Sequence, residues 1–476
     1  MLGSQRDFSC PSFPFIDATR RYRHRTSSAR FRTDALVHLC LMNVVMPSSP
    51  SEPADTFADL YELAAKLRRQ IAAAAVDPRA ERRAILELEG ALQGFVRQAG
   101  GDVEARRFAS RAAADAYREI AERSDQAVSR ADVAALLAEV VRWDAVGRYA
   151  PDPEVWQGLG GLLDPDIPAQ TAIFAGDVES AGQQYLRALA YHSAGLDQLD
   201  GEAVWHAIEL IDLCLPYLSM SRRPLSAAHY VADPQTGAVP QRRLDASMLS
   251  GFHFATRTAC EYLGEIGSGL GRIDGASHPD ISLSPSRLLA WRHLRRLWAD
   301  ATPVRRHRRH ALGGQVRIVR GVAECLRLIS GQEAQELPAW NVCNVSRSSM
   351  AIVLPSAHAD VPRLGELVGV RFDDADRCQL GIVQRLCLDA RGLVCGIQLV
   401  ARAASVATLE DGRAPVTVLL CDSPARGESV RLMFACANAL ADGALFLKVG
   451  AVVFRLRALD VPLIGEGFAM RAYQLT

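Results

Sequence analysis

The period of the hydrophobic pattern changes near residue 303, and this change constrains the fold more than any other feature of the sequence. Before it, apolar residues recur at alternating steps of three and four, for example from Phe57 to Ile71, which is typical of one face of a helix. After it, short β-branched runs such as 350–354 and 393–400 are separated by turn residues. That spacing is typical of an antiparallel barrel or sandwich. The sequence therefore predicts an α+β multidomain protein, helical in front and β behind.

Length and composition narrow the class of protein further. The 476 residues correspond to about three domains at ~150 residues each. The 54 basic residues balance 54 acidic ones, and 49% of the residues are hydrophobic, as in ordinary globular proteins. This composition argues against a disordered chain or a polybasic coat for nucleic acid. No run approaches the ~20 apolar residues of a spanning helix, so we expect no membrane span.

The first 45 residues differ from the rest of the chain. They contain seven arginines and three acidic residues, and an apolar stretch at 35–46 overlaps their end. This order is typical of a secretory signal, but His38 and Asn43 interrupt the apolar stretch and no A-x-A cleavage site follows. We interpret residues 1–45 as a disordered leader or as the product of a wrongly assigned start codon upstream of Met42 or Met46.

The cysteines indicate a reducing compartment. There are eleven, an odd number, and no two are spaced as C-x-x-C. Metal sites commonly use paired ligands at short spacing, so we expect no metal site. Most of the later cysteines lie inside apolar, strand-like runs, where a free cysteine packs as a small hydrophobe. We therefore predict a cytoplasmic protein.

Composition shifts divide the chain into predicted regions after the leader. A helical domain over 46–150 precedes a second helical segment over 151–302, within which we expect an irregular stretch at 220–245 and a helix at 246–266. A β-barrel is predicted over 303–405. The remaining residues, 406–476, are shorter and predict a small β domain or an extension of that barrel.

An arginine-rich segment marks the border between the helical and β halves. Residues 301–323 contain no acidic residue and six arginines: Arg305, Arg306, Arg308, Arg309, Arg317 and Arg320. All but two of the 54 basic residues of the chain are arginine, so a cluster of arginines is weak by itself. More informative is the R-x-x-x-R spacing of Arg305 and Arg309 directly before a predicted strand. A later strand leads into the sequence Asn-Val-Ser-Arg-Ser-Ser at 344–349.

In these features the sequence resembles the PilZ domain, the bacterial receptor module for cyclic di-GMP. That family combines R-x-x-x-R before its first strand with [D/N]-x-S-x-x-G after a following strand. The sequences at 364–370, 380–385 and 396–399 resemble its later strands. The resemblance covers about residues 303–405, a fifth of the chain, and depends on the order and spacing of several short motifs.

The resemblance implies a ligand and a set of binding residues. Cyclic di-GMP has two phosphates and two guanines, and guanidinium groups form bidentate bonds to phosphate or to the guanine edge and stack on bases. The implied ligand-binding residues are Arg305, Arg309, Asn344, Ser346 and Ser349. Arg306 and Arg308 are possible additions. The implied function is a cyclic di-GMP effector in motility, pili or surface behaviour, in which the ligand closes the arginine segment over the barrel and alters contact with a protein partner.

One motif position departs from the family pattern, and it leaves an alternative open. Ser349 stands where the family has glycine. If that position needs a positive φ, the serine costs ~1–2 kcal/mol. The alternative is therefore a degenerate PilZ-like scaffold that binds no nucleotide and acts through protein contacts.

Other classes of function find less support in the sequence. The chain has no H-E-x-x-H, no G-x-S-x-G and no Walker lysine, so we predict no enzyme, no catalytic residues and no cofactor. A nucleic-acid binder using the arginines of 305–320 remains a weaker alternative. That run lacks interleaved aromatic residues, and a zero net charge gives no bulk attraction to phosphates.

Overall fold

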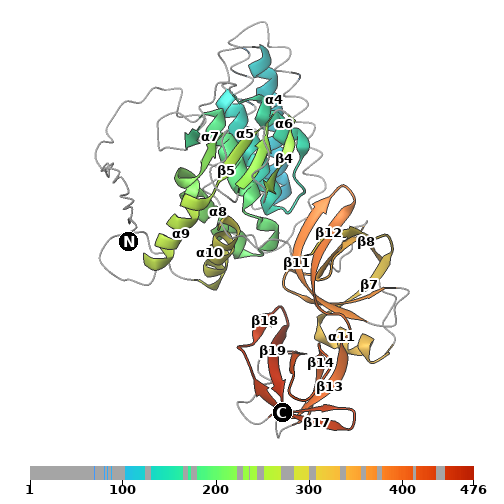
Figure 1. Cartoon of the computed structure of the whole chain (residues 1–476). Coiled ribbons are helices and arrows are strands. Elements are labelled where there is room, and N and C mark those ends of the chain that lie inside the picture. Colours follow the sequence, from blue (N-terminus) through green and yellow to red (C-terminus); the bar gives the residue numbers. More distant parts are fainter. Residues whose placement is uncertain are drawn as a thin grey trace, which may run out of the picture.

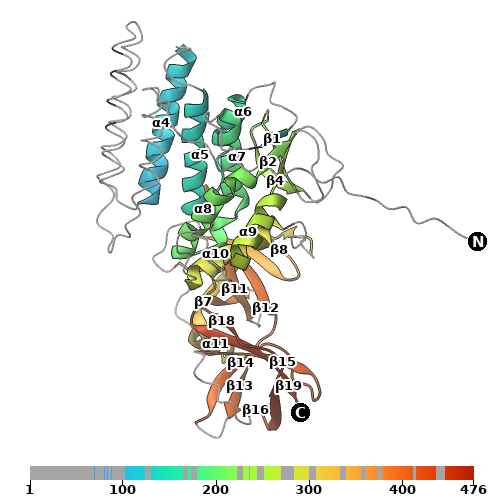
Figure 2. The same ribbon diagram turned by 90° about the vertical axis from the view of Figure 1, so that its left-hand side faces the viewer.

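The structure is a computed structural model that describes most of the chain after residue 101 and five isolated helical residues before it. The continuous described ranges are 102–123, 130–163, 170–172, 180–221, 229–234, 236–243, 251–269, 284–299, 307–332, 339–354, 361–372, 378–410, 414–435 and 445–476. The leader at 1–45 and the predicted helical stripes near Phe57 and Ile85 lie outside the described residues. Figures 1 and 2 show three parts in succession: a helical region, a first barrel and a second barrel.

The helical region contains seven described α-helices and two short 3-10 helices. They are α4 (Val103–Arg123), α5 (Arg130–Val146), α6 (Pro153–Gly161), α7 (Ala181–Ser193), η1 (Leu196–Gln198), α8 (Glu202–Cys214), η2 (Leu215–Tyr217), α9 (Arg257–Gly269) and α10 (Pro285–Trp298). Local sequence fixes several of their starts. Ser180 and Gln183 form a reciprocal capping box at α7, and Asp152 and Ser284 cap α6 and α10 ahead of a proline. Helix α5 is central and buried along most of its length.

A five-stranded antiparallel sheet accompanies these helices, and it corrects the prediction for 220–266. Its strands are β1 (Gln170–Ala172), β2 (Ser219–Ser221), β3 (His229–Asp233), β4 (Ala238–Arg243) and β5 (Phe252–Ala255), in the order β1-β2-β5-β3-β4. The predicted irregular stretch at 220–245 thus contains a hairpin, in which Gly237 adopts φ +63°. The predicted helix at 246–266 begins only with α9, because Phe252–Ala255 pairs as a strand.

The first barrel is a closed ring of six antiparallel strands. The ring order is β7-β10-β11-β12-β9-β8, and the pairing of β8 with β9 on one side and with β7 on the other closes it. Its members are β7 (Gln315–Arg320), β8 (Ala339–Val345), β9 (Ser349–Leu354), β10 (Leu367–Phe372), β11 (Gln379–Asp389) and β12 (Gly392–Ala401). Strand β7 shows the period of two, since Val316 and Ile318 are buried and Gln315 and Arg317 are exposed. The two-residue strand β6 (His310–Ala311) adds to the outside of β8.

The second barrel is also a closed ring of six strands, where we expected a small β domain or an extension. Its ring order is β13-β16-β17-β19-β15-β14. The strands are β13 (Ser405–Glu410), β14 (Val416–Leu420), β15 (Ser429–Phe434), β16 (Leu445–Val449), β17 (Val452–Ala458) and β19 (Phe468–Leu475), with β18 (Leu463–Gly465) paired to β19. The α+β class is therefore confirmed, and the β half contains two barrels.

The two barrels have the same strand connectivity. We number the six ring strands of each barrel from 1 to 6 in chain order. In both barrels, strand 1 pairs with strands 2 and 4, strand 3 pairs with strands 2 and 6, and strand 5 pairs with strands 4 and 6. Each barrel has its own apolar interior, around Ile352 and Val368 in the first and around Leu432 and Leu447 in the second.

A further apolar cluster joins the barrels to each other. Helix α11 (Gly321–Ile329), which follows β7 and was not predicted, contributes Val322 and Cys325. The cluster also includes Leu380 of the first barrel and Leu419 and Met433 of the second. All are buried, so the barrels share a continuous core. In the described part of the chain, no helix is long and apolar enough to cross a membrane.

Candidate functional site

The predicted binding motif lies at the turn between β8 and β9. The Ser346 hydroxyl accepts hydrogen bonds from the backbone N–H groups of Ser348 (3.3 Å) and Ser349 (3.0 Å). The Ser346 N–H donates to the Ser349 carbonyl at 2.7 Å. These bonds form a compact turn whose tip, Arg347 and Ser348, is exposed. The turn therefore presents an ordered backbone to solvent.

The pairing of β6 brings part of the arginine segment to this turn. His310 pairs with Val345 and Ala311 with Asn344, and one further step in that register places Arg309 opposite Ser346. Arg308 and Arg309 are both exposed. Arg305 and Arg306 lie outside the described residues.

Two more arginines lie at the same end of the barrel. Arg347 occupies the turn, and Arg402, just after β12, donates from Nη2 to the Arg347 carbonyl at 2.6 Å. We call Arg308, Arg309, Arg347 and Arg402 the turn arginines. Arg347 and Arg402 meet at this turn, and Arg308 and Arg309 directly precede the paired strand β6, so this end of the barrel concentrates positive charge of the kind that suits phosphate groups.

The two polar residues that flank the turn differ in their surroundings. Asn344 is half-buried, and its Oδ1 has no hydrogen-bond partner. Such an atom is costly unless a ligand or water satisfies it. The Ser349 hydroxyl lies 2.8 Å from that of Ser346, and Ser349 is not in the left-handed region of φ. The serine therefore carries no backbone strain at the position where the family has glycine.

Four exposed apolar residues lie in one short segment of the second barrel, which carries no motif in the sequence. Leu459, Val461, Leu463 and Ile464 are 52%, 85%, 51% and 58% exposed. We call these four residues the apolar strip. They follow β17 and run beside β19, where the Ala472 N–H donates to Asp460 Oδ1 at 3.0 Å and Arg471 Nε donates to the Asp460 carbonyl at 2.8 Å. The strip thus lies on a backbone held in place at Asp460.

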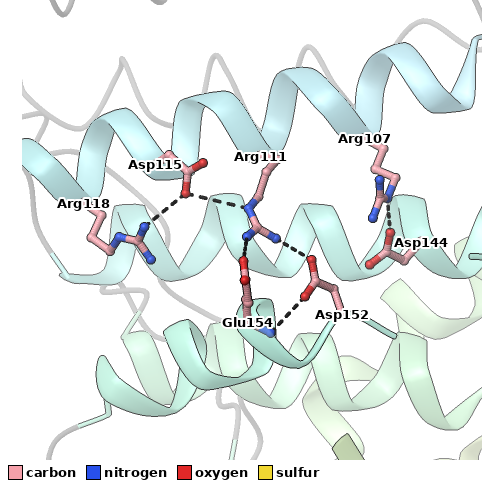
Figure 3. A network of polar contacts seen from close by, with 7 residues as sticks. All are labelled: Arg107, Arg111, Asp115, Arg118, Asp144, Asp152 and Glu154. Atoms are coloured by element: carbon pink, nitrogen blue, oxygen red, sulfur yellow. Dashed lines mark hydrogen bonds and ion pairs between the residues drawn. The ribbon is translucent and has the colours of Figure 1, made fainter. Parts of the chain in front are cut away.

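A network of charged side chains ties the first described helices together (Figure 3). Arg111 on α4 donates to Asp152 Oδ2 at 2.7 Å and to Glu154 Oε2 at 2.8 Å, at the start of α6. Nearby, Arg107 pairs with Asp144 of α5. Burial raises the pKa of the Asp144 carboxyl to about 6, against the effect of Arg107. This network stabilises the helical packing and does not reach the turn arginines.

The remaining candidate chemistry is limited among the described residues. In these ranges no group of three or more His, Cys, Asp or Glu side chains is placed to hold a metal ion. The eight described cysteines are free thiols, and burial raises the pKa of Cys395 and Cys421 to about 12, so these thiols are poor nucleophiles at neutral pH.

Comparison with known proteins gives no relative for this chain. No protein-family model matches it, and no curated protein or solved structure matches it either.

Proposed function

We propose that the protein is an interaction scaffold whose helical region and tandem barrels bind other proteins. The observation that carries this proposal is the apolar strip. Large apolar side chains that are exposed within one short, ordered segment are typical of protein-binding sites, because a partner removes them from water. The sequence contains no enzyme motif that competes with this function.

The charges beside the strip favour one kind of partner. Arg455 and Arg457 are exposed on β17, directly before Leu459. A segment that combines apolar residues with carboxylates would bury the strip and pair with these arginines. We therefore propose an acidic amphipathic segment of a partner protein as the occupant.

A peptide library tests this proposal. Random 16-residue peptides displayed on phage are selected against the full chain, and the recovered peptides are measured by fluorescence anisotropy. We expect peptides rich in Asp, Glu and large apolar residues. The double variant V461D/I464D should weaken their binding more than about tenfold, because it puts charge into the contact.

The control is L289D, which changes an exposed leucine of α10 (53% exposed) outside both barrels. Leu289→Asp should leave peptide binding within about twofold. Selected peptides that bind V461D/I464D as tightly as the unaltered chain would contradict the proposal.

A second function, binding of cyclic di-GMP, is favoured by the turn arginines. Supporting it are the pairing of β6 with β8, which brings Arg309 to the turn, and the unsatisfied Asn344 Oδ1. The ligand would bind through its phosphates to the guanidinium groups beside Ser346. Arg305, the other arginine of the motif, is proposed from the sequence alone. The protein would then act as a cytoplasmic effector in bacterial signalling, with motility, pili or surface behaviour as its setting.

Isothermal titration with cyclic di-GMP tests this second function. If the nucleotide binds, the double variants R305A/R309A and R309A/R347A should each abolish the heat of binding. R391A is the control, because Arg391 is an exposed arginine paired with Asp389 at a different turn. The variant S349G should bind no more tightly than the unaltered chain, because Ser349 is unstrained. If cyclic di-GMP at concentrations of about tens of micromolar gives no heat of binding, this second function is excluded and only the scaffold function remains.

A further inference from the structure

A cavity lies at the joint between the helical region and the first barrel. Its volume is about 780 Å³, within the range of small-molecule sites. Helices α5, α6 and α7 and strands β3 and β4 contribute to its wall, and Arg385 of β11 is its contribution from the barrel. An occupant of this cavity would contact two parts of the molecule at once.

The joint itself consists of a few specific bonds. Leu388 N–H donates to the Arg148 carbonyl at 2.7 Å, and Ala150 N–H donates to the Leu388 carbonyl at 2.8 Å. Close to them, the Arg385 guanidinium pairs with the Asp197 carboxylate. This ion pair is the side-chain bond that joins the barrel to the cavity wall.

Backbone strain is located at the same joint. Arg148 adopts φ +59°, and it is the described non-glycine residue in the left-handed region. Its Nη2 donates to the Leu199 carbonyl and to Asp200 Oδ1, both at 2.8 Å. Such strain is typical of functional or switching sites when the surrounding contacts hold it.

The wall of the cavity combines aromatic rings with two carboxylates, Asp144, which pairs with Arg107, and Asp197. Tyr149, His192 and Tyr230 are half-buried and line it. His192 Nε2 lies 3.0 Å from the Pro240 carbonyl, which can only accept, so this nitrogen carries the proton and the ring is fixed. The His192 ring also makes an edge contact with Trp156, at 5.4 Å between centroids. Aromatic faces together with a carboxylate favour organic cations.

The two side chains of the Arg385–Asp197 pair differ in exposure, and this difference allows another cation to replace Arg385. The Asp197 side chain is only 15% exposed, whereas that of Arg385 is 52% exposed. The carboxylate is therefore held in the wall, while its cationic partner comes from a surface side chain that can turn into solvent at small cost. A ligand cation can take the place of Arg385 at Asp197.

We propose that this cavity binds a small aromatic amine. Its ammonium group pairs with Asp197 in place of Arg385, and its ring packs among Tyr149, His192 and Tyr230. Loss of the Arg385–Asp197 pair loosens the joint, so the ligand changes how the first barrel is held against the helical region. The site is independent of the apolar strip and of the turn arginines.

Three matched compounds test the site by isothermal titration: 2-phenylethylamine, 2-phenylethanol and phenylacetate. They share a ring and differ in charge. We expect saturable binding of the amine, binding of the alcohol more than about tenfold weaker, and no binding of the acid. Equal binding of all three, or no saturation by the amine at about 10 mM, would overturn the proposal.

Two variants separate the role of Asp197 from an effect on folding. D197N should weaken amine binding more than about tenfold, and R385A should leave it unchanged or make it tighter, because it removes the competing cation. D389N is the control on the same strand, since Asp389 pairs with Arg391 and does not line the cavity. Unchanged amine binding in D197N, or lost binding in R385A, would contradict the assignment.

Hydrogen exchange measures the effect on the joint. Bound amine should speed exchange at the amides of Ala150 and Leu388, the two that bridge the helical region and the barrel. Amine binding without faster exchange at these amides would refute the proposed loosening.

Discussion

The two barrels share one strand connectivity but differ in the side chains that they expose. The first presents guanidinium groups around a serine-capped turn, whereas the second presents the apolar strip on an ordered backbone. The interior of each ring is apolar, and the outward positions differ. The comparison indicates that one strand connectivity accommodates different outward-facing side chains and different added strands, β6 in the first barrel and β18 in the second.

Because the two barrels share an apolar cluster, we expect them to unfold together. A substitution in that cluster should have the largest effect on the free energy of unfolding. Leu419 is fully buried in the cluster that joins the barrels, and Leu432 is fully buried inside the second barrel. Each change to alanine should lower the free energy of unfolding by about 2–5 kcal/mol. In hydrogen exchange, L419A should raise exchange in both barrels, and L432A mainly in the second.

An exchange pattern for L419A confined to the second barrel would break this comparison. The barrels would then unfold independently in spite of the packing around α11.

Two glycines, one in each barrel, are required for different physical reasons. Gly381 of β11 has no room for a side chain, because an added Cβ would overlap Ile397 and lie 3.1 Å from the Gln398 carbonyl. Gly450, in the turn between β16 and β17, has open space but adopts φ +59°. We expect G381A to cost about 1–3 kcal/mol through overpacking and G450A about 1–2 kcal/mol through backbone strain.

Urea unfolding of both variants measures these costs. Asparagine tolerates the left-handed conformation, so G450N should recover much of the stability lost in G450A, whereas G381N should be worse than G381A. Recovery at both positions would show that packing does not distinguish them.

A pH dependence gives the smallest expected effect. In the second barrel, Asp422 accepts hydrogen bonds from Arg431 N (2.8 Å), Nε (2.9 Å) and Nη2 (2.6 Å). Burial acts against the charged carboxylate, but these bonds outweigh it and lower the pKa of Asp422. A lowered pKa means that the stabilisation is present at neutral pH and is lost as the pH falls through the native pKa, below about 4.

The variant D422N should therefore be less stable than the unaltered chain by about 0.5–1 kcal/mol at pH 7, with a difference that shrinks below about pH 4. Urea unfolding between about pH 3 and pH 7 measures this difference. A constant difference over that range would show that the carboxylate charge of Asp422 does not matter. The first barrel contains a similar pair, in which Arg320 Nε donates to Glu366 Oε1 at 3.0 Å and to Oε2 at 3.1 Å.

Local sequence was enough to predict many of the individual strands. The predicted run at 350–354 lies within β9, and the run at 416–420 coincides with β14. Both could be predicted because their β-branched residues are bounded by turn residues. Closure of the rings could not be predicted. It depends on β9 pairing with β12 and β15 with β19, and such long-range pairs leave no periodic signal. The strands β3 to β5 were missed because they are short and flanked by residues typical of loops.

The candidate site also has one part that the sequence predicts and another that only the fold shows. The spacing of Arg305, Arg309, Asn344 and Ser346 is visible in the sequence, and the register of β6 and β8 could be known only from the fold. The apolar strip was invisible, because Leu-Asp-Val-Pro-Leu-Ile has the composition of a buried strand as much as of an exposed one. Burial is a property of the packed chain.

Ring closure also affects the order of events during synthesis. In each barrel the sixth ring strand completes the ring by pairing with the third, so a nascent chain that has emerged only as far as β11 or β17 has two open edges. Open edges are templates for aggregation. The first barrel can close as soon as β12 has left the ribosome, before the second barrel has emerged. Ribosome pausing after β12 would therefore protect the nascent chain, whereas pausing within β11 would expose it to mispairing and to chaperone capture.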